Sequence, residues 1–214
     1  MHDLFAAQTV GTRTSLGPQA CVLHGFALPL AEYVLADVQA IAAQSPFRQM
    51  TTPGGHVMQV AMSGCGRYGW CSDRRGYRYD AIDPHTGQPW PPLPLAFLQV
   101  AANAANAAGF AGYVPDACLI NRYLPGTRLS LHQDRDEDDR VAPIVSVSLG
   151  LPATFLFGGF ARSDKTLRVP LTHGDVVVWG GVDRMRFHGV LPIKPGRHAV
   201  LGEQRINLTF RKVR

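Results

Sequence analysis

The sequence has 214 residues, of which 46% are hydrophobic and 17% are charged, and its formal net charge is +5. This length corresponds to one domain, and the hydrophobic content excludes an intrinsically disordered chain. The pI of about 9.3 permits a polyanionic partner such as nucleic acid, without requiring one, because charge steers association but does not read a partner.

The start of the chain and its cysteines bear on its location. Met1-His2-Asp3-Leu4-Phe5 lacks the basic and apolar regions of a signal peptide. The most apolar long window, residues 27–43, contains two acidic residues, so no membrane span is expected. The four cysteines form no C-x-x-C pair and are expected to be reduced thiols. We therefore expect a cytoplasmic protein.

The first half of the chain is expected to combine two helices with turns and irregular segments. Apolar residues recur at helical spacing over residues 30–44 and 93–108, and Ser45-Pro46 and Gly109 end these helices. Residues 64–79 are rich in Arg and aromatic residues and are expected to be irregular. The other assignments are a loose arm over 1–20, short strands over 21–25 and 56–62, a turn over 52–55 and a proline-rich connection over 84–94.

The second half changes to short strands separated by glycine-containing turns. The turn signals are Gly158-Gly159, His173-Gly174, Gly180-Gly181 and Pro195-Gly196. Short strands at regular spacing predict a sandwich, a barrel or a jelly roll. The predicted strands are 117–123, 144–149, 154–157, 167–171, 175–179, 198–201 and 205–211.

His132-Gln133-Asp134 is a candidate for a metal-binding motif. A histidine and a carboxylate two residues apart on an extended segment point to the same side, although such a tripeptide alone is weak evidence. His188, which follows a long apolar run, can complete a set of two histidines and one carboxylate. This set is the facial triad of non-haem Fe(II) oxygenases. His173 and His198 also follow Asp134, but we favour surface or packing roles for them.

The last predicted strand carries a polar face. Period-two alternation places Ile206, Leu208 and Phe210 on one face, and on the other the polar set Arg205, Asn207, Thr209 and Arg211. A polar face on a terminal strand is ordinarily exposed to solvent. The alternative is the interior of a barrel that holds a charged ligand. The two arginines are six residues apart, about 20 Å on a strand, and guanidinium groups bind carboxylates in a bidentate manner.

These motifs together resemble the AlkB family, in particular its bacterial members. The resemblance also includes Ser45-Pro46-Phe47-Arg48-Gln49-Met50, Asn121-Arg122-Tyr123, Pro143 to Gly150 and His173 to Gly181, and it extends over nearly the whole chain. It implies a mostly β, α+β fold, with a double-stranded β-helix (a cupin-like jelly roll) over residues 111–214. Helices and a nucleotide-recognition lid would occupy residues 21–110, and the loose arm would occupy residues 1–20.

The resemblance also implies cofactors and their ligands. Fe(II) would be held by His132, Asp134 and His188, with 2-oxoglutarate and O2 as co-substrates. Arg205 would pair with the distal carboxylate of 2-oxoglutarate, and Arg211 would lie nearer the metal. The other implied 2-oxoglutarate contacts are Leu119, Asn121, Tyr123 and Asn207.

The implied substrate is an alkylated base. Trp70 would stack on the flipped base against His132, Met62 would line the pocket, and Asp136 would contact the exocyclic amino group. The implied contacts to the nucleic-acid backbone are Thr52, Tyr77 and Arg162. A carboxylate suits the cationic ring of an N-methylated adenine or cytosine. Glu137, Asp138 and Asp139 are expected to form a solvated acidic turn.

The resulting hypothesis is a monomeric oxidative dealkylase of nucleic-acid bases such as 1-methyladenine and 3-methylcytosine. Its products would be an aldehyde, succinate, CO2 and the repaired base. Single-stranded DNA would be preferred, with double-stranded DNA or RNA as further substrates, because the base must leave its stack. Two alternatives stay open: an oxygenase of the same chemistry that acts on a protein or a small molecule, and a non-catalytic nucleic-acid-binding β-barrel.

Overall fold

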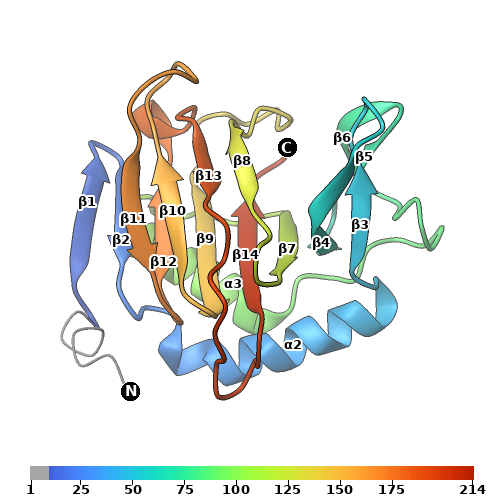
Figure 1. Ribbon diagram of the computed structural model, residues 1–214, viewed down its shortest axis with the longest axis horizontal. Coiled ribbons are helices and arrows are strands. Elements are labelled where there is room, and N and C mark those ends of the chain that lie inside the picture. The colour runs from blue at the N-terminus through green and yellow to red at the C-terminus, as the bar shows by residue number, and fades with distance from the viewer. Residues whose placement is uncertain (1–9) are drawn as a thin grey trace.

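The computed structural model describes residues 10–214 (Figure 1). The start of the chain and the first part of the predicted arm lie outside the described residues. Within residues 10–214, no helix is both long and apolar enough to cross a membrane. The elements are β1 (Arg13–Gly17), β2 (Ala20–Leu23), η1 (Leu28–Leu30), α2 (Ala31–Gln44), β3 (Arg48–Thr51), β4 (Val57–Gly66), β5 (Gly69–Asp73), β6 (Gly76–Asp80), α3 (Leu95–Ala107), β7 (Ala117–Tyr123), β8 (Leu129–His132), β9 (Ile144–Gly150), β10 (Ala153–Phe157), β11 (Leu167–Leu171), β12 (Val176–Trp179), η2 (Gly181–Asp183), β13 (His188–Val190) and β14 (Arg205–Arg211).

The core is built from two antiparallel sheets. The larger has the strand order β1-β2-β12-β9-β14-β7-β4-β3, and the smaller has the order β11-β10-β13-β8. The smaller sheet lies in front of the larger one in Figure 1, and α3 lies behind the larger sheet. Buried residues of α2 and α3 belong to one core cluster with the apolar side chains of β14. The mostly β fold and the jelly-roll architecture predicted from the sequence are confirmed.

Strand β14 is central to this arrangement because it pairs with β9 on one side and β7 on the other. Its side chains alternate as predicted. Ile206, Leu208 and Phe210 belong to the core beneath the helices, where Phe210 meets the ring of Phe97 edge-on at 5.7 Å. The polar side chains of β14 therefore face the space between the two sheets. Every residue of β14 is buried, so the solvent-exposed alternative for its polar face is wrong.

Residues 64–79 are ordered, which corrects the expectation of an irregular segment. Strand β4 extends to Gly66, and β5 and β6 form a separate two-stranded hairpin. Gly76 turns between the two strands with a φ of +116°, a conformation that favours glycine. The hairpin rests on Trp90, because a Cβ at Gly69 would lie only 2.1 Å from that ring. We call residues 69–80 the lid hairpin.

Several short strands were not predicted. Arg13–Gly17 form the edge strand β1, so this part of the predicted arm is not loose. Strands β3, β8 and β13 have four residues or fewer, too few for a clear alternation. Their pairing with neighbouring strands fixes them instead. The predicted strand at 198–201 is wrong: these residues form a turn closed by a bridge between His198 and Gly202.

Candidate active site

A cavity of about 1050 Å³ lies between the two sheets and beneath the lid hairpin. All the site residues predicted from the sequence line this one cavity. They are Thr52, Met62, Trp70, Tyr77, Leu119, Asn121, Tyr123, His132, Asp134, Asp136, Arg162, His188, Arg205, Asn207 and Arg211. They come from the lid, from both sheets and from the loops between strands, so the fold brings together residues that are far apart in the sequence.

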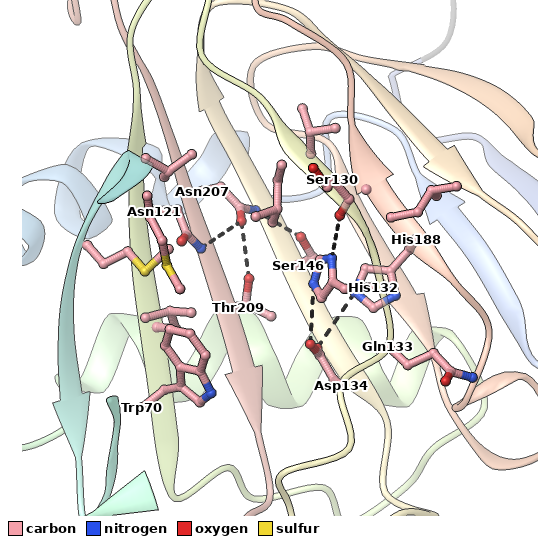
Figure 2. Close-up of a pocket in the computed structure, with 18 of the residues that line it drawn as sticks. Trp70, Asn121, Ser130, His132, Gln133, Asp134, Ser146, His188, Asn207 and Thr209 are labelled. Carbon is pink, nitrogen blue, oxygen red and sulfur yellow. Dashed lines mark hydrogen bonds and ion pairs between the residues drawn. The ribbon is translucent and has the colours of Figure 1, made fainter. Parts of the chain in front are cut away.

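His132, Asp134 and His188 converge at one side of the cavity (Figure 2). Strand pairing places His188 directly opposite His132, and Asp134 follows just after β8 ends. Nε2 of His132 lies 3.5 Å from Oδ1 of Asp134, and Nε2 of His188 lies 3.7 Å from Oδ2. The three candidate ligand atoms all lie within 4.8 Å of one another, which suits a single metal ion.

The backbone orients both imidazoles for this purpose. Nδ1 of His132 donates to the carbonyl of Ser130 at 2.8 Å, and Nδ1 of His188 donates to the carbonyl of Arg186 at 3.1 Å. A carbonyl only accepts, so each neutral ring carries its proton on Nδ1 and leaves the Nε2 lone pair free. This arrangement of a ligand histidine is typical of metal sites.

The protonation states also favour cation binding. Burial and the neighbouring His132 lower the pKa of His188 to about 3, so its ring is neutral at physiological pH. Burial opposes ionisation of Asp134, but Arg211 and the two histidines outweigh it and hold the pKa of that carboxyl well below its usual range. His188 thus offers a neutral nitrogen and Asp134 a carboxylate, and together with His132 they form the ligand set of a facial triad.

His173 and His198 do not reach this site. Their rings contact each other at 4.4 Å, and Nδ1 of His173 accepts a hydrogen bond from the backbone of Gly150. Both side chains lie outside the cavity lining. The packing role favoured for them from the sequence agrees with these contacts.

A buried ion-pair network surrounds Asp134. Arg211 donates from Nε and Nη2 to Oδ2 of Asp134, at 3.0 and 2.7 Å, and also lies 3.1 Å from Glu137. Arg184 donates to the backbone carbonyl of Asp134 at 2.8 Å and to Glu137 at 3.0 Å. Glu137 is only 3% exposed, so the prediction that it belongs to a solvated turn is wrong. Two buried guanidinium groups hold it in the interior.

The opposite end of β14 carries Arg205, which is 1% exposed. Its Nη2 donates to Ser148 Oγ at 2.9 Å, and its guanidinium lies 4.9 Å from the centre of the Tyr123 ring. Within residues 10–214, Nε and Nη1 of Arg205 have no hydrogen-bond partner, and neither do the Tyr123 hydroxyl and Asn121 Oδ1. Burial lowers the pKa of Arg205, since it disfavours the cation. Among these atoms, the N–H groups of Arg205 and the hydroxyl of Tyr123 can donate, and they fit an anionic, oxygen-rich ligand.

Amide and hydroxyl groups occupy the middle of β14 and the adjacent strands (Figure 2). Asn121 donates to Oδ1 of Asn207 at 3.3 Å, and Asn207 in turn donates to Ser146 Oγ at 2.8 Å and to the Val147 carbonyl at 2.9 Å. Because β14 lies between β7 and β9, these side chains share one face of the sheet. They form a fixed polar floor between Arg205 and the histidines.

The lid hairpin supplies the aromatic side of the cavity. Trp70 stacks on Tyr77, with ring centres 5.6 Å apart and an angle of 15° between their planes. The indole N–H of Trp70 donates to Oδ2 of Asp136 at 2.9 Å. Tyr77 is 49% exposed at the mouth of the cavity, whereas Met62 is buried within it. A half-buried tryptophan stacked on an exposed tyrosine, next to an exposed carboxylate, suits a flat, cationic ring.

Several residues of the site carry no role in the predictions from the sequence. Ser146 and Ser148 support Asn207 and Arg205, and Trp179 and Phe155 form an apolar wall against His188, with ring centres 4.9 and 6.1 Å from its ring. A signal for the serines exists, because they alternate with valines in an otherwise apolar strand. Arg184 has no such signal, since its role depends entirely on long-range contacts.

Comparisons with known proteins agree with this geometry. Residues 19–211 match the family described as the 2OG-Fe(II) oxygenase superfamily. The chain is 57% identical to the alpha-ketoglutarate-dependent dioxygenase AlkB of Salmonella typhimurium and 53% identical to that of Escherichia coli, in each case over 99% of this chain and 98% of the relative. The solved structure of OsALKBH1 is similar with a TM-score of 0.82 at 29% identity, and covers 94% of this chain and 99% of that one.

Proposed function

Because the chain belongs to the AlkB family of 2OG-Fe(II) oxygenases, we propose that it removes alkyl groups oxidatively from N-alkylated bases of nucleic acid. Family membership makes it an Fe(II)- and 2-oxoglutarate-dependent dioxygenase that uses O2. The base substrates that we propose are those of direct alkylation repair, such as 1-methyladenine and 3-methylcytosine. The observation that carries the proposal is a single cavity shared by the triad, the unsatisfied Arg205 and the lid aromatics.

In this proposal His132, Asp134 and His188 hold the iron. The free Nε2 atoms of the two histidines and the ionised carboxylate of Asp134 fit Fe(II). Three protein ligands leave coordination positions open for the co-substrates. Arg205 holds the distal carboxylate of 2-oxoglutarate, with Asn121 and Tyr123 as neighbouring hydrogen-bond donors. Further contacts come from Leu119, Asn207 and, toward the metal, Arg211. Once bound, iron and 2-oxoglutarate supply the O2 activation that hydroxylates the alkyl carbon, with release of CO2 and succinate.

The lid residues hold the base. Trp70 stacks on the ring opposite His132, Met62 packs against it, and Asp136 accepts a hydrogen bond from its exocyclic amino group. The carboxylate of Asp136 also favours the positive charge of a methylated adenine or cytosine over the neutral, repaired base. Thr52, Tyr77 and Arg162 lie at the cavity lining where they can contact the phosphate backbone. The carbon on the alkylated nitrogen is thereby presented to the metal side of the cavity.

We further propose a preference for single-stranded DNA, because a base reaches this cavity only after leaving its stack. We also propose that the protein acts as a monomer. Four free cysteines, all buried, agree with a cytoplasmic location. We also propose that residues 1–214 form one dioxygenase domain, with its lid region before residue 111 and its β-helix core after it.

The proposal is tested with oligonucleotides that carry 1-methyladenine or 3-methylcytosine, incubated with Fe(II) and 2-oxoglutarate. Mass spectrometry should show loss of the methyl group, one succinate per repaired base, and faster repair of single strands. Omission of 2-oxoglutarate is the matched control. Succinate formation without repair of any methylated oligonucleotide would contradict the base substrate and favour a protein or small-molecule substrate.

A further inference from the structure

The lid hairpin is attached to the core through two neighbouring acidic residues. Trp70 and Tyr79 face each other across β5 and β6, so their side chains lie on the same face of the hairpin. Trp70 donates to Asp136 at 2.9 Å, and the Tyr79 hydroxyl donates to Oε1 of Glu137 at 2.7 Å. Both acids follow Asp134 closely in the sequence. The lid is therefore docked on the same segment that carries a proposed metal ligand.

The two contacts differ in their surroundings. Asp136 is exposed, so its hydrogen bond to Trp70 can exchange with water or with a substrate amino group. Glu137 is 3% exposed, and its other partners are the guanidinium groups of Arg184 and Arg211. Burial raises the pKa of Tyr79 well above its usual range, so its hydroxyl keeps the proton that it donates. The Tyr79–Glu137 hydrogen bond is therefore the more buried of the two.

Glu137 connects this hydrogen bond to Asp134 by two routes. Through Arg211 it reaches the carboxylate of Asp134, because Nε of Arg211 lies 3.1 Å from Glu137 and 3.0 Å from Asp134 Oδ2. Through Arg184 it reaches the backbone carbonyl of Asp134. Two guanidinium groups balance the two carboxylates, and all four are buried. Such a network holds each member in place only while all of its hydrogen bonds are made.

We propose that Tyr79 and Glu137 are positioning residues that couple docking of the lid hairpin to the order of Asp134. When the hairpin is docked, the Tyr79 hydroxyl fixes Glu137, and Glu137 keeps both arginines on Asp134. When the hairpin lifts, Glu137 loses this donor and the arginines gain freedom to shift. The coupling rests on the proposed roles of Asp134 as a metal ligand and of the hairpin as the base-binding lid. It would prepare the metal site for turnover when the lid is closed over a base.

The test compares the Tyr79→Phe variant with the wild type in the absence of nucleic acid. Amide hydrogen exchange reports the hairpin over residues 69–80 and the segment over residues 132–139. The affinity for Mn²⁺, a redox-inert probe, reports the metal site. We expect faster exchange in both segments and a Mn²⁺ affinity that is roughly two- to tenfold weaker, the range for loss of one hydrogen bond.

Two control variants isolate the coupling. Trp70→Phe removes the donor to Asp136 without a change of charge and leaves the Tyr79–Glu137 hydrogen bond in place, so it should weaken the Mn²⁺ affinity less than Tyr79→Phe does. Tyr33→Phe removes a hydroxyl from the exposed face of α2, where Tyr33 is 68% exposed, and should change neither readout.

Wild-type Mn²⁺ affinity in Tyr79→Phe, with or without a loosened hairpin, would overturn the proposal. A loss of affinity in Trp70→Phe as large as that in Tyr79→Phe would also overturn it, because the effect would then not depend on the Tyr79–Glu137 hydrogen bond. No readout uses nucleic acid or turnover. Failure of the base-repair assay with an intact Tyr79 effect would count against the proposed substrate alone.

Discussion

The two arginines of strand β14 differ in what the protein provides for them. Arg211 lies between the carboxylates of Asp134 and Glu137, and these partners raise its pKa well above the usual value although burial opposes them. Arg205, six residues earlier, is as deeply buried, but its recorded hydrogen bond within residues 10–214 goes to the neutral hydroxyl of Ser148. Because a neutral hydroxyl does not offset the cost of burying a cation, burial lowers the pKa of Arg205.

The difference indicates two functions for the same residue type. The charge of Arg211 is neutralised by the chain itself, so this arginine is part of the folded structure around the metal site. We propose that the charge of Arg205 is left for a ligand. A buried cation without a counter-charge destabilises the free protein, and a carboxylate that binds there recovers the lost interaction. The predictions below test this distinction.

The largest effect is expected at the metal end, from Asp134→Ala. This change removes one of three protein ligands and leaves Arg211 without its main partner, so turnover should be abolished and Fe(II) binding strongly weakened. Succinate release and metal titration measure the two effects. Asp138→Ala, an exposed acid in the same segment, is the control and should retain wild-type activity. Normal turnover in Asp134→Ala would move the metal elsewhere.

Arg211→Ala should destabilise the metal-free protein. It leaves two buried carboxylates with too little positive charge, which costs about 3–5 kcal/mol. For a chain of this length, the melting temperature should fall by roughly 6–20 °C. Lys212→Ala, which loses only a surface ion pair to Asp116, should change it little. A wild-type melting temperature in Arg211→Ala would refute the structural role of this arginine.

Arg205→Ala should have the opposite effect on the stability of the ligand-free protein. Without 2-oxoglutarate its stability should equal or exceed that of the wild type, because an unpaired buried cation is removed. Binding of 2-oxoglutarate should weaken by about 2–5 kcal/mol, and the oligonucleotide KM should change little. Steady-state kinetics measure both, with Arg197→Ala in the exposed preceding loop as the control. Unchanged dependence on 2-oxoglutarate would place the co-substrate away from β14.

The smallest of these effects is expected at the lid, from Trp70→Ala. Loss of base stacking costs about 1–3 kcal/mol, so kcat/KM on methylated single strands should fall roughly ten- to a hundredfold. The slow succinate formation without nucleic acid should stay near the wild-type rate, because neither end of β14 is altered. If the melting temperature and every activity fell together in Trp70→Ala, Trp70 would instead serve only to pack the lid hairpin.

The sequence predicted those parts of the site that depend on local order. The spacing of His132 and Asp134 and the alternation along residues 205–211 both persist in the structure, because a strand fixes where consecutive side chains point. The two long helices followed from apolar spacing for the same reason. The choice of His188 as a ligand beside His132 depends on resemblance as well as spacing, since no local rule determines which strands become neighbours.

Glu137 and the lid hairpin show what local rules could not provide. A run of acidic residues ordinarily lies in water, and burial of Glu137 depends on Arg184 and Arg211, which are distant in the sequence. The hairpin is not evident in the sequence because its Arg and aromatic side chains face a cavity and a solvent surface rather than a continuous core. Likewise, the missing partners of Arg205 become visible only when all its neighbours are known.

Ligand truncation tests our claim that Arg205 pairs with the distal carboxylate of a co-substrate. Binding of 2-oxoglutarate and of 2-oxopentanoate, which lacks that carboxylate, is measured by calorimetry with Mn²⁺ for the wild type and for Arg205→Ala. The wild type should strongly prefer 2-oxoglutarate, and the variant should bind both ligands equally weakly. An undiminished preference for 2-oxoglutarate in Arg205→Ala would contradict the claim.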